Sequence, residues 1–227
     1  MIRRFPTFAL PSALALVLLS GCGREGTPPT PVAAGPDAAM PGAGTAPVVL
    51  QDVIETKPDY IVGISYPQGI AKHPALAQAL QAYAESARAE LMQSVAALKG
   101  SKPSAPYDLS LQFIGLVDTP RIVAAAADGS SYTGGAHGNP LVARFVWLPS
   151  EQRMLSAEQL VPDAASWKIV SDHAREQLMT ALSQQLDDDG LEAAERSQAL
   201  RDGSGMIDAG TEPDPKNFVR FEPVMNA

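Results

Sequence analysis

The sequence is poor in the residues from which metal and nucleophilic sites are usually built. It holds one cysteine and three histidines among 227 residues, and only 6% of its residues are aromatic. A single cysteine excludes an intrachain disulfide. His73, His137 and His173 stand far apart, and His173 with Glu176 on one helical turn supplies too few ligands for a zinc site. The sequence therefore predicts no metal site and no cofactor.

Signatures of hydrolases are absent as well. No His-Glu-x-x-His occurs, no serine is followed three residues later by lysine, and the nearest approach to Gly-x-Ser-x-Gly, residues 129–133, ends in threonine. The acidic run at 187–190 does not fit a calcium loop, because alignment on its glycine places Gln185 at the first ligand and Arg196 at the last. We predict no catalytic residues and favour a protein that is not an enzyme.

Long apolar runs are missing except at the N-terminus. There, Arg3 and Arg4 precede an apolar run from Phe8 to Leu19, which is too short to cross a bilayer as a permanent helix. Residues 1–21 are therefore typical of a secretory signal peptide. The run ends in Leu-Ser-Gly-Cys, which resembles the bacterial lipobox, whose cysteine, here Cys22, becomes the lipidated first residue of the mature chain.

A lipid such as palmitate on Cys22 gives the only thiol a role, since no second cysteine is present to pair with it. Several acyl chains on one residue form a stable membrane anchor. The alternative is an ordinary signal peptide with an incidental cysteine. Gly23 stands where an aspartate would indicate retention in the inner membrane. We therefore expect a cell-envelope protein that faces the periplasm, and favour the outer membrane.

Positive charge is scarce. The chain has 17 Lys and Arg against 25 Asp and Glu, a formal net charge of −8, and removal of residues 1–21 takes away Arg3 and Arg4 and no acid, which lowers it to −10. Nucleic-acid binding requires a clustered basic face that neutralises phosphates. We expect no nucleic-acid partner.

Residues 22–47 are rich in Gly, Pro, Ala and Thr and bury too little apolar surface to fold, which predicts a tether. In the half at 48–160, period-two alternation predicts strands at 60–66, 107–113, 121–127 and 141–148, a turn at Asp128-Gly129, and a short strand at 153–155. A helix begins at Pro74 and ends before Gly100. Its apolar stripe is Leu76, Leu80, Tyr83, Ala87, Leu91, Val95 and Leu98. Ser156 and Gln159 have the spacing of a capping box.

The half at 161–227 is mainly helical. One long helix starts near Asp163 as N-cap, a shorter one covers 191–200 and closes at Gly203, and residues 218–224 predict a final strand. The apolar face of the long helix is Trp167, Val170, Ala174, Leu178, Leu182 and Leu186. Helices interrupting strands that pair as hairpins predict an α+β fold, in which a mainly antiparallel sheet packs with two long helices in two sub-parts.

The most unusual stretch is Tyr132-Thr-Gly-Gly-Ala-His-Gly-Asn139. Its glycines permit positive φ and close approach of a ligand, and His137 offers a titratable ring between them. We take Tyr132, Gly134, Gly135, His137, Gly138 and Asn139 as candidate ligand-binding residues. The alternative is a purely structural loop between two strands, with His137 bonded to backbone groups.

This stretch, the preceding strand pattern and Ile64-Ser-Tyr-Pro67 resemble a family of extracytoplasmic domains of unknown function. The family includes the outer part of RsiV, a lysozyme-responsive anti-sigma factor, and modules beside PdaC-type peptidoglycan deacetylases. The resemblance spans roughly residues 50–227 and implies an α+β fold in two halves, an envelope location and, for the studied relative, recognition of lysozyme. We expect a lysozyme-like protein or peptidoglycan as the partner.

This sequence differs from the family members in ways that limit which of their activities can be expected of it. A lipobox and tether stand in place of a sigma-binding segment and a membrane-spanning helix, and the deacetylase catalytic module is missing, so neither activity is expected. Family members continue into a further segment after the strand near Phe221, which favours a truncated chain. The sequence leaves two hypotheses: a ligand-binding envelope lipoprotein, or a cell-wall hydrolase that uses His137 with Asp108 or Asp118.

Overall fold

The computed structural model of the protein describes residues 48–224, and these fall within one compact unit. The predicted signal peptide, the tether and Cys22 lie outside the described residues. No helix between 48 and 224 combines the length and the apolar character that crossing a bilayer requires.

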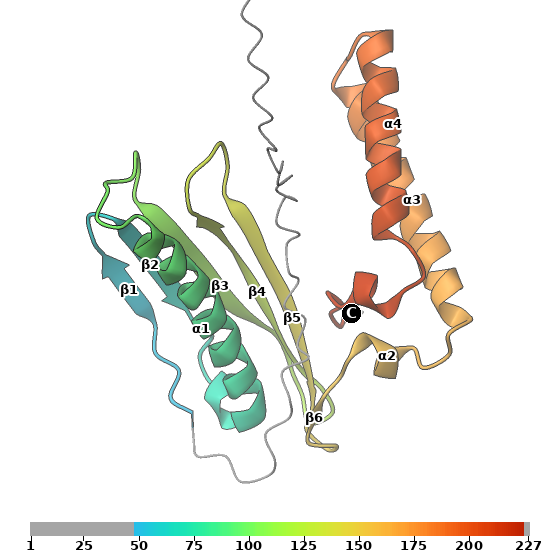
Figure 1. The fold of residues 1–227 in the computed structure, drawn as a ribbon. Coiled ribbons are helices and arrows are strands. Elements are labelled where there is room, and N and C mark those ends of the chain that lie inside the picture. The colour runs from blue at the N-terminus through green and yellow to red at the C-terminus, as the bar shows by residue number, and fades with distance from the viewer. Residues whose placement is uncertain (1–47, 225–227) are drawn as a thin grey trace, which may run out of the picture. The chain divides into compact units, whose positions relative to one another are not determined.

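Six strands form one sheet in the order of the sequence (Figure 1). They are β1 Val53–Thr56, β2 Tyr60–Ser65, β3 Tyr107–Asp118, β4 Val123–Tyr132, β5 Asn139–Leu148 and β6 Arg153–Met154. Neighbouring strands are antiparallel except β2 and β3, which are parallel and joined through a helix, as parallel neighbours require. The predicted α+β class with a mainly antiparallel sheet is confirmed.

Helix α1, Pro74–Ala97, connects β2 to β3 and covers one face of the sheet (Figure 1). Pro74 occupies its first turn, and Gly100 follows its end with φ 83°. The core between helix and sheet contains Val62, Ile64, Leu76, Leu80, Leu91, Leu109, Leu111, Phe113 and Phe145. The apolar stripe predicted for this helix therefore does pack on the sheet.

The C-terminal part consists of α2 Ala157–Leu160, α3 Ser166–Asp188, α4 Ala193–Gly210 and the 3-10 turn η2 Pro215–Phe218. The predicted capping box at Ser156 and Gln159 is present at the start of α2. Asp163 accepts backbone N–H groups of Ala165 and Ser166 at 3.2 and 3.1 Å, so it stabilises the start of α3, although the N-cap is Ala165, two residues later than predicted. Helices α3 and α4 pack on each other.

The structure corrects the sequence prediction at two glycines that were expected to mark a turn and a helix end. Asp128-Gly129 is not a turn, because β4 continues through it to Tyr132, and a Cβ on Gly129 would lie 2.0 Å from the Ser110 carbonyl oxygen of β3. Gly203 does not end α4, which runs on to Gly210, and a Cβ at Gly203 would lie 2.7 Å from Leu182 of α3. Both glycines permit close approach of a neighbouring element rather than a change of direction.

Three further predictions differ from the structure. Residues 219–224 form no strand, so the predicted final strand is wrong. Strand β1 was not predicted, because its alternation of half-buried and exposed residues extends over only four residues. In α3, Trp167 and Leu186 are buried, but Leu178 is 47% exposed, because only part of the predicted apolar face packs against α4.

Candidate functional site

The candidate loop joins β4 to β5 at one end of the sheet (Figure 1). Tyr132 is the last residue of β4, Asn139 is the first of β5, and the register pairs Ser131 with Asn139. The loop is thus the connection of a long hairpin. The sequence placed all six candidate residues together, and the structure confirms that they are neighbours in one loop.

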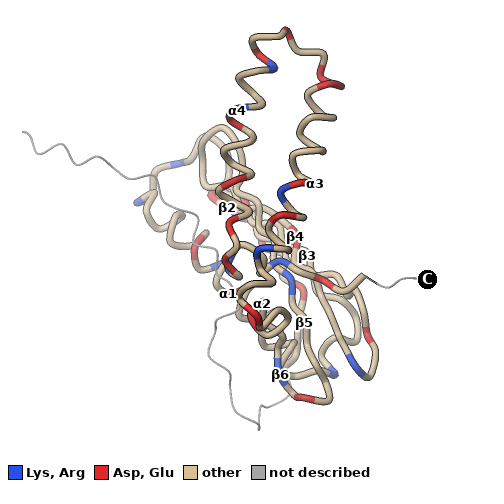
Figure 2. Tube along the Cα trace, turned by 90° about the vertical axis from the view of Figure 1, so that its right-hand side faces the viewer, with Lys and Arg blue, Asp and Glu red and all other residues tan. Residues whose placement is uncertain are grey.

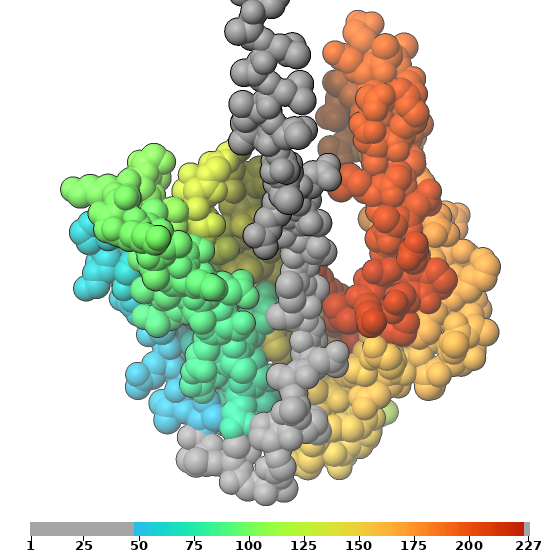
Figure 3. All heavy atoms as spheres, in the orientation of Figure 1, coloured from blue at the N-terminus to red at the C-terminus, as the bar shows by residue number. Residues whose placement is uncertain are grey.

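The loop is held by contacts within itself. The Tyr132 hydroxyl donates to the Gly135 carbonyl oxygen at 3.2 Å, and Gly134 and Gly135 have φ of 98° and 100°. Such values favour glycine strongly, because a side chain there would clash with the backbone. A Cβ on Gly138 would lie 3.3 Å from the Ser131 carbonyl oxygen, so this glycine allows the two strand ends to approach. Gly134 and Gly135 are exposed, and the loop reaches the surface (Figure 3).

His137 is exposed, and its Nδ1 lies 3.2 Å from the Gly138 carbonyl oxygen, to which the protonated nitrogen donates. No carboxylate among residues 48–224 forms an ion pair with the ring; the histidine that has one is His73. Asp108 lies opposite Tyr132 in the register of β3 and β4, at the loop's end of the sheet. This arrangement leaves the imidazole available to solvent and to a ligand.

Asp118, the other acid considered for a hydrolase, lies at the opposite end of β3. Its carboxylate is 2.6 Å from Lys72 Nζ and 3.5 Å from His73 Nε2, and the contact with Lys72 is the main cause that lowers the pKa of Asp118. Since the two ends of a twelve-residue strand are far apart, Asp118 does not act together with His137.

A comparison with protein-family models finds a match in the sheet and helix α1. Residues 54–140, from β1 to the first residues of β5, match the family model described as "Deacetylase PdaC". We call residues 54–140 the PdaC-type domain, after the model that they match. The match includes the whole candidate loop, and it confirms the resemblance to a PdaC-associated domain that the loop motif predicted.

Comparisons with whole proteins are more distant. No curated protein matches the chain significantly. A DUF3298 family member from Bacteroides fragilis NCTC 9343 is 15% identical, with a TM-score of 0.38, over 65% of this chain and 70% of that one. A DUF3298 family protein from Pseudomonas aeruginosa PAO1 is 18% identical, with a TM-score of 0.39, over 61% and 68% of the two chains.

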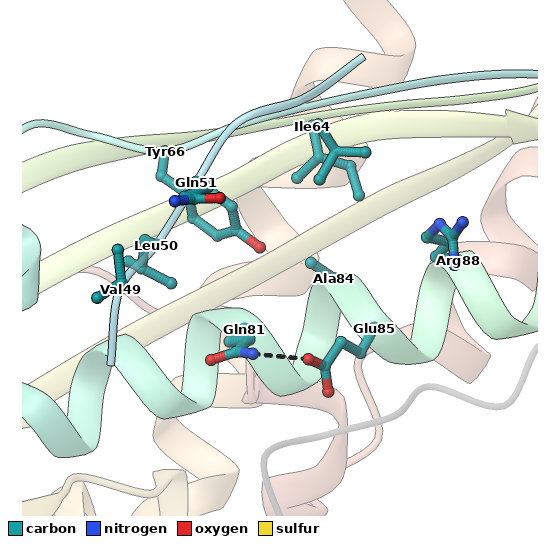
Figure 4. Close-up of a pocket in the computed structure, with 10 residues that line it drawn as sticks. Val49, Leu50, Gln51, Ile64, Tyr66, Gln81, Ala84, Glu85 and Arg88 are labelled. Atoms are coloured by element: carbon teal, nitrogen blue, oxygen red, sulfur yellow. Dashed lines mark hydrogen bonds between the residues drawn. The ribbon is translucent and has the colours of Figure 1, made fainter. Parts of the chain in front are cut away.

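Two small hollows lie away from the loop. One lies where residues 49–53 approach helix α1 (Figure 4), and the other lies between residues 50–52 and residues 66–71. The larger has a volume of about 200 Å³ and a mixed lining in which Gln81 donates to Glu85 at 2.7 Å. Tyr66 borders both hollows, and its ring stacks on Phe113 with centroids 4.9 Å apart. No sequence pattern indicated these hollows, because irregular chain within residues 49–52 lines one wall of each. Both are smaller than the roughly 300 to 1,000 Å³ of ordinary ligand pockets.

Charge is distributed unevenly between the PdaC-type domain and the helices that follow it. Residues 163–214 hold twelve of the acidic and four of the basic residues, a difference of eight that equals the net charge of −8 for the whole chain. Figure 2 shows acidic residues recurring along both α3 and α4. The four cations are engaged within these helices, as in Arg196 with Asp187 and Arg175 with Asp208 at 3.0 Å. Residues 54–140 hold seven acidic and six basic residues, so the PdaC-type domain carries no such excess.

Proposed function

We propose that this chain is a lipid-anchored protein of the bacterial cell envelope whose PdaC-type domain binds a ligand through the loop Tyr132–Asn139. The supporting observation is the form of the loop: an exposed hairpin connection, fixed by its own hydrogen bond and by two glycines with positive φ, that displays backbone groups and the His137 ring. A preorganised loop loses little conformational entropy when it binds.

The ligand is a lysozyme-like protein or peptidoglycan. The resemblance stated above supports this choice, and the matching family is named after a deacetylase. The loop's exposed carbonyl and N–H groups, with one imidazole, suit a ligand rich in hydrogen-bonding groups. Cys22 would carry the lipid and hold the domain at the membrane, with the outer membrane favoured.

The test is binding to two separate baits, c-type lysozyme and purified peptidoglycan, by the intact chain. Gly135→Val should abolish saturable binding, because valine does not adopt a φ of 100° although space around Gly135 is free. Gly69→Val is the matched control, since Gly69 has φ 78° and free space but lies at the other end of the sheet. Equal binding by the Gly135 and Gly69 variants would contradict a role for the loop.

The same experiment separates binding from hydrolysis. In the binding hypothesis His137→Ala weakens binding less than Gly135→Val, because the backbone of the loop is the main contact surface. If the domain instead releases soluble fragments from peptidoglycan, and His137→Ala stops that release, the protein is a hydrolase. Anchoring is tested by labelling cells with a palmitate analogue, which should mark the chain but not its Cys22→Ser variant.

A further inference from the structure

The outer edge of β5 is unpaired over most of its length. Strand β6 pairs only with Trp147 and Leu148, and residues 139–145 have no backbone partner on that side within 48–224. The Leu155 N–H donates to the Val146 carbonyl oxygen, which shows that Val146 directs its backbone groups outward. Because these groups alternate along a strand, Val142 and Arg144 also direct their N–H and C=O groups outward. A free edge of this kind can pair with another extended chain.

The C-terminal segment Val219–Val224 contacts the Arg144 side chain of β5 and makes no backbone bond to the strand. Arg144 Nε donates to Glu222 Oε2 at 2.6 Å, and Arg144 Nη1 donates to Asp128 Oδ1 at 2.9 Å. The Arg144 side chain is only 19% exposed, so its guanidinium is largely removed from water. Along the segment, half-buried and exposed residues alternate as in a strand, yet no backbone bond joins it to β5.

We propose that the outer edge of β5 binds an extended segment of a partner protein that carries a carboxylate between two apolar residues. The outward N–H and C=O groups of Val142 and Arg144 would supply the backbone bonds of an added strand. Arg144 selects the carboxylate, because a charge-assisted bond to a partly buried guanidinium is stronger than a neutral one. The half-buried Phe221 and Pro223 on either side of Glu222 indicate the apolar flanks.

Glu222 occupies the place of the partner's carboxylate, so the partner must displace it. A partly buried arginine that loses Glu222 and gains no other acid is left with Asp128 alone. Removing the charge of Glu222 therefore frees the site for an acidic segment in trans. This inference concerns the strand edge and does not rest on the function proposed for the loop.

The test uses the intact chain and a labelled eight-residue peptide with the sequence of residues 217–224, Asn-Phe-Val-Arg-Phe-Glu-Pro-Val. Fluorescence anisotropy should show saturable binding to the Glu222→Gln chain, at least about tenfold tighter than to the unchanged chain. Adding Arg144→Ala to Glu222→Gln should weaken binding at least tenfold. Adding Arg153→Ala to Glu222→Gln instead should leave peptide binding unchanged, because Arg153 pairs with Glu151 beyond the free edge.

Two further variants separate the strand edge from the charge. A peptide with lysine in place of its glutamate should bind the Glu222→Gln chain at least about tenfold more weakly. Val142→Pro removes one outward N–H and should abolish binding while the circular dichroism spectrum stays that of the folded chain. The loop variant Gly135→Val should bind the peptide normally.

Three results would overturn the proposal. The first is no saturable binding by the Glu222→Gln chain, and the second is binding that neither Arg144→Ala nor the lysine peptide weakens. The third is a Glu222→Gln chain that forms dimers and takes no peptide, which would assign the edge to a second copy of this chain.

Discussion

A single methyl group at Gly129 tests the close pairing of β3 and β4. In Gly129→Ala the new Cβ would lie 2.0 Å from the Ser110 carbonyl oxygen and 2.9 Å from the Leu111 Cα. Both are backbone atoms of a paired strand, so no side-chain rotation relieves the overlap and the strands must separate. Overpacking of a core costs about 1 to 3 kcal/mol, and we place this variant at the upper end because backbone is involved.

The assay is unfolding in urea and by heat, followed by circular dichroism. A loss of about 3 kcal/mol corresponds to a fall in Tm of roughly 6 to 12 °C for a chain of this size. Gly63→Ala is the matched control, since Gly63 is also a strand glycine but nothing lies within 4 Å of the position of its Cβ. The reasoning would be refuted if both variants unfolded at the same urea concentration as the unchanged chain.

Three smaller changes test other parts of the fold. Leu80→Ala leaves a cavity under α1, where Leu80 is 0% exposed, and should lower the free energy of unfolding by about 2 to 5 kcal/mol in urea titrations. Gly205→Ala, in the interior of α4 with free space around it, should raise that free energy by about 0.5 to 1 kcal/mol in the same assay. Asp118→Asn should be less stable than the unchanged chain at pH 7: the folded pKa of Asp118 lies below its ordinary value of 3.8, so its contribution is present above that value and is lost as the pH falls through the folded pKa. The gap in urea midpoint between the two chains should therefore narrow as the pH falls below 3.8, and a gap that does not change with pH would contradict the ion pair with Lys72.

The sequence correctly predicted those parts of the fold in which one local pattern determines the secondary structure. Helix α1 follows from a proline, a stripe of apolar residues and a terminal glycine, and β3 follows from strict alternation starting at Tyr107. The capping box at Ser156 is a local pattern that needs no tertiary information. Each of these patterns lies within a single helix, strand or turn, and the tertiary contacts of that element favour the same secondary structure.

The wrong predictions concern positions whose structure depends on a contact with another element. Such a contact cannot be identified from the local sequence pattern. Gly129 resembles a turn residue until the Ser110 carbonyl of β3 is placed beside it, and Gly203 resembles a helix stop until Leu182 is placed beside it. Residues 219–224 alternate as a strand does, but pairing needs a partner with free groups in register, and in this structure the contact is made by the Glu222 side chain instead.

The candidate loop was found in the sequence because its residues are contiguous and rich in glycine, but its chemistry needed the structure. The sequence alone does not choose between Asp108 and Asp118 as the acid partner of His137 in a hydrolase, since the two stand ten residues apart in one strand. The sheet register places Asp108 at the loop's end, and the ion pair with Lys72 engages Asp118 at the other. The Nδ1 bond to the Gly138 carbonyl leaves Nε2 of His137 free, but no carboxylate among residues 48–224 forms an ion pair with the ring, so the described residues supply no acid partner for a histidine base.

Loop and strand edge are continuous, because Asn139 ends the loop and begins β5. A ligand that lies on the loop could extend along the outward groups of Val142 and Arg144, whereas a small ligand would touch the loop alone. The two binding experiments distinguish these cases. If the eight-residue peptide and lysozyme compete for the Glu222→Gln chain, the loop and the edge form one protein-binding surface. If both bind together, the edge serves a separate partner and the loop is left to its own ligand.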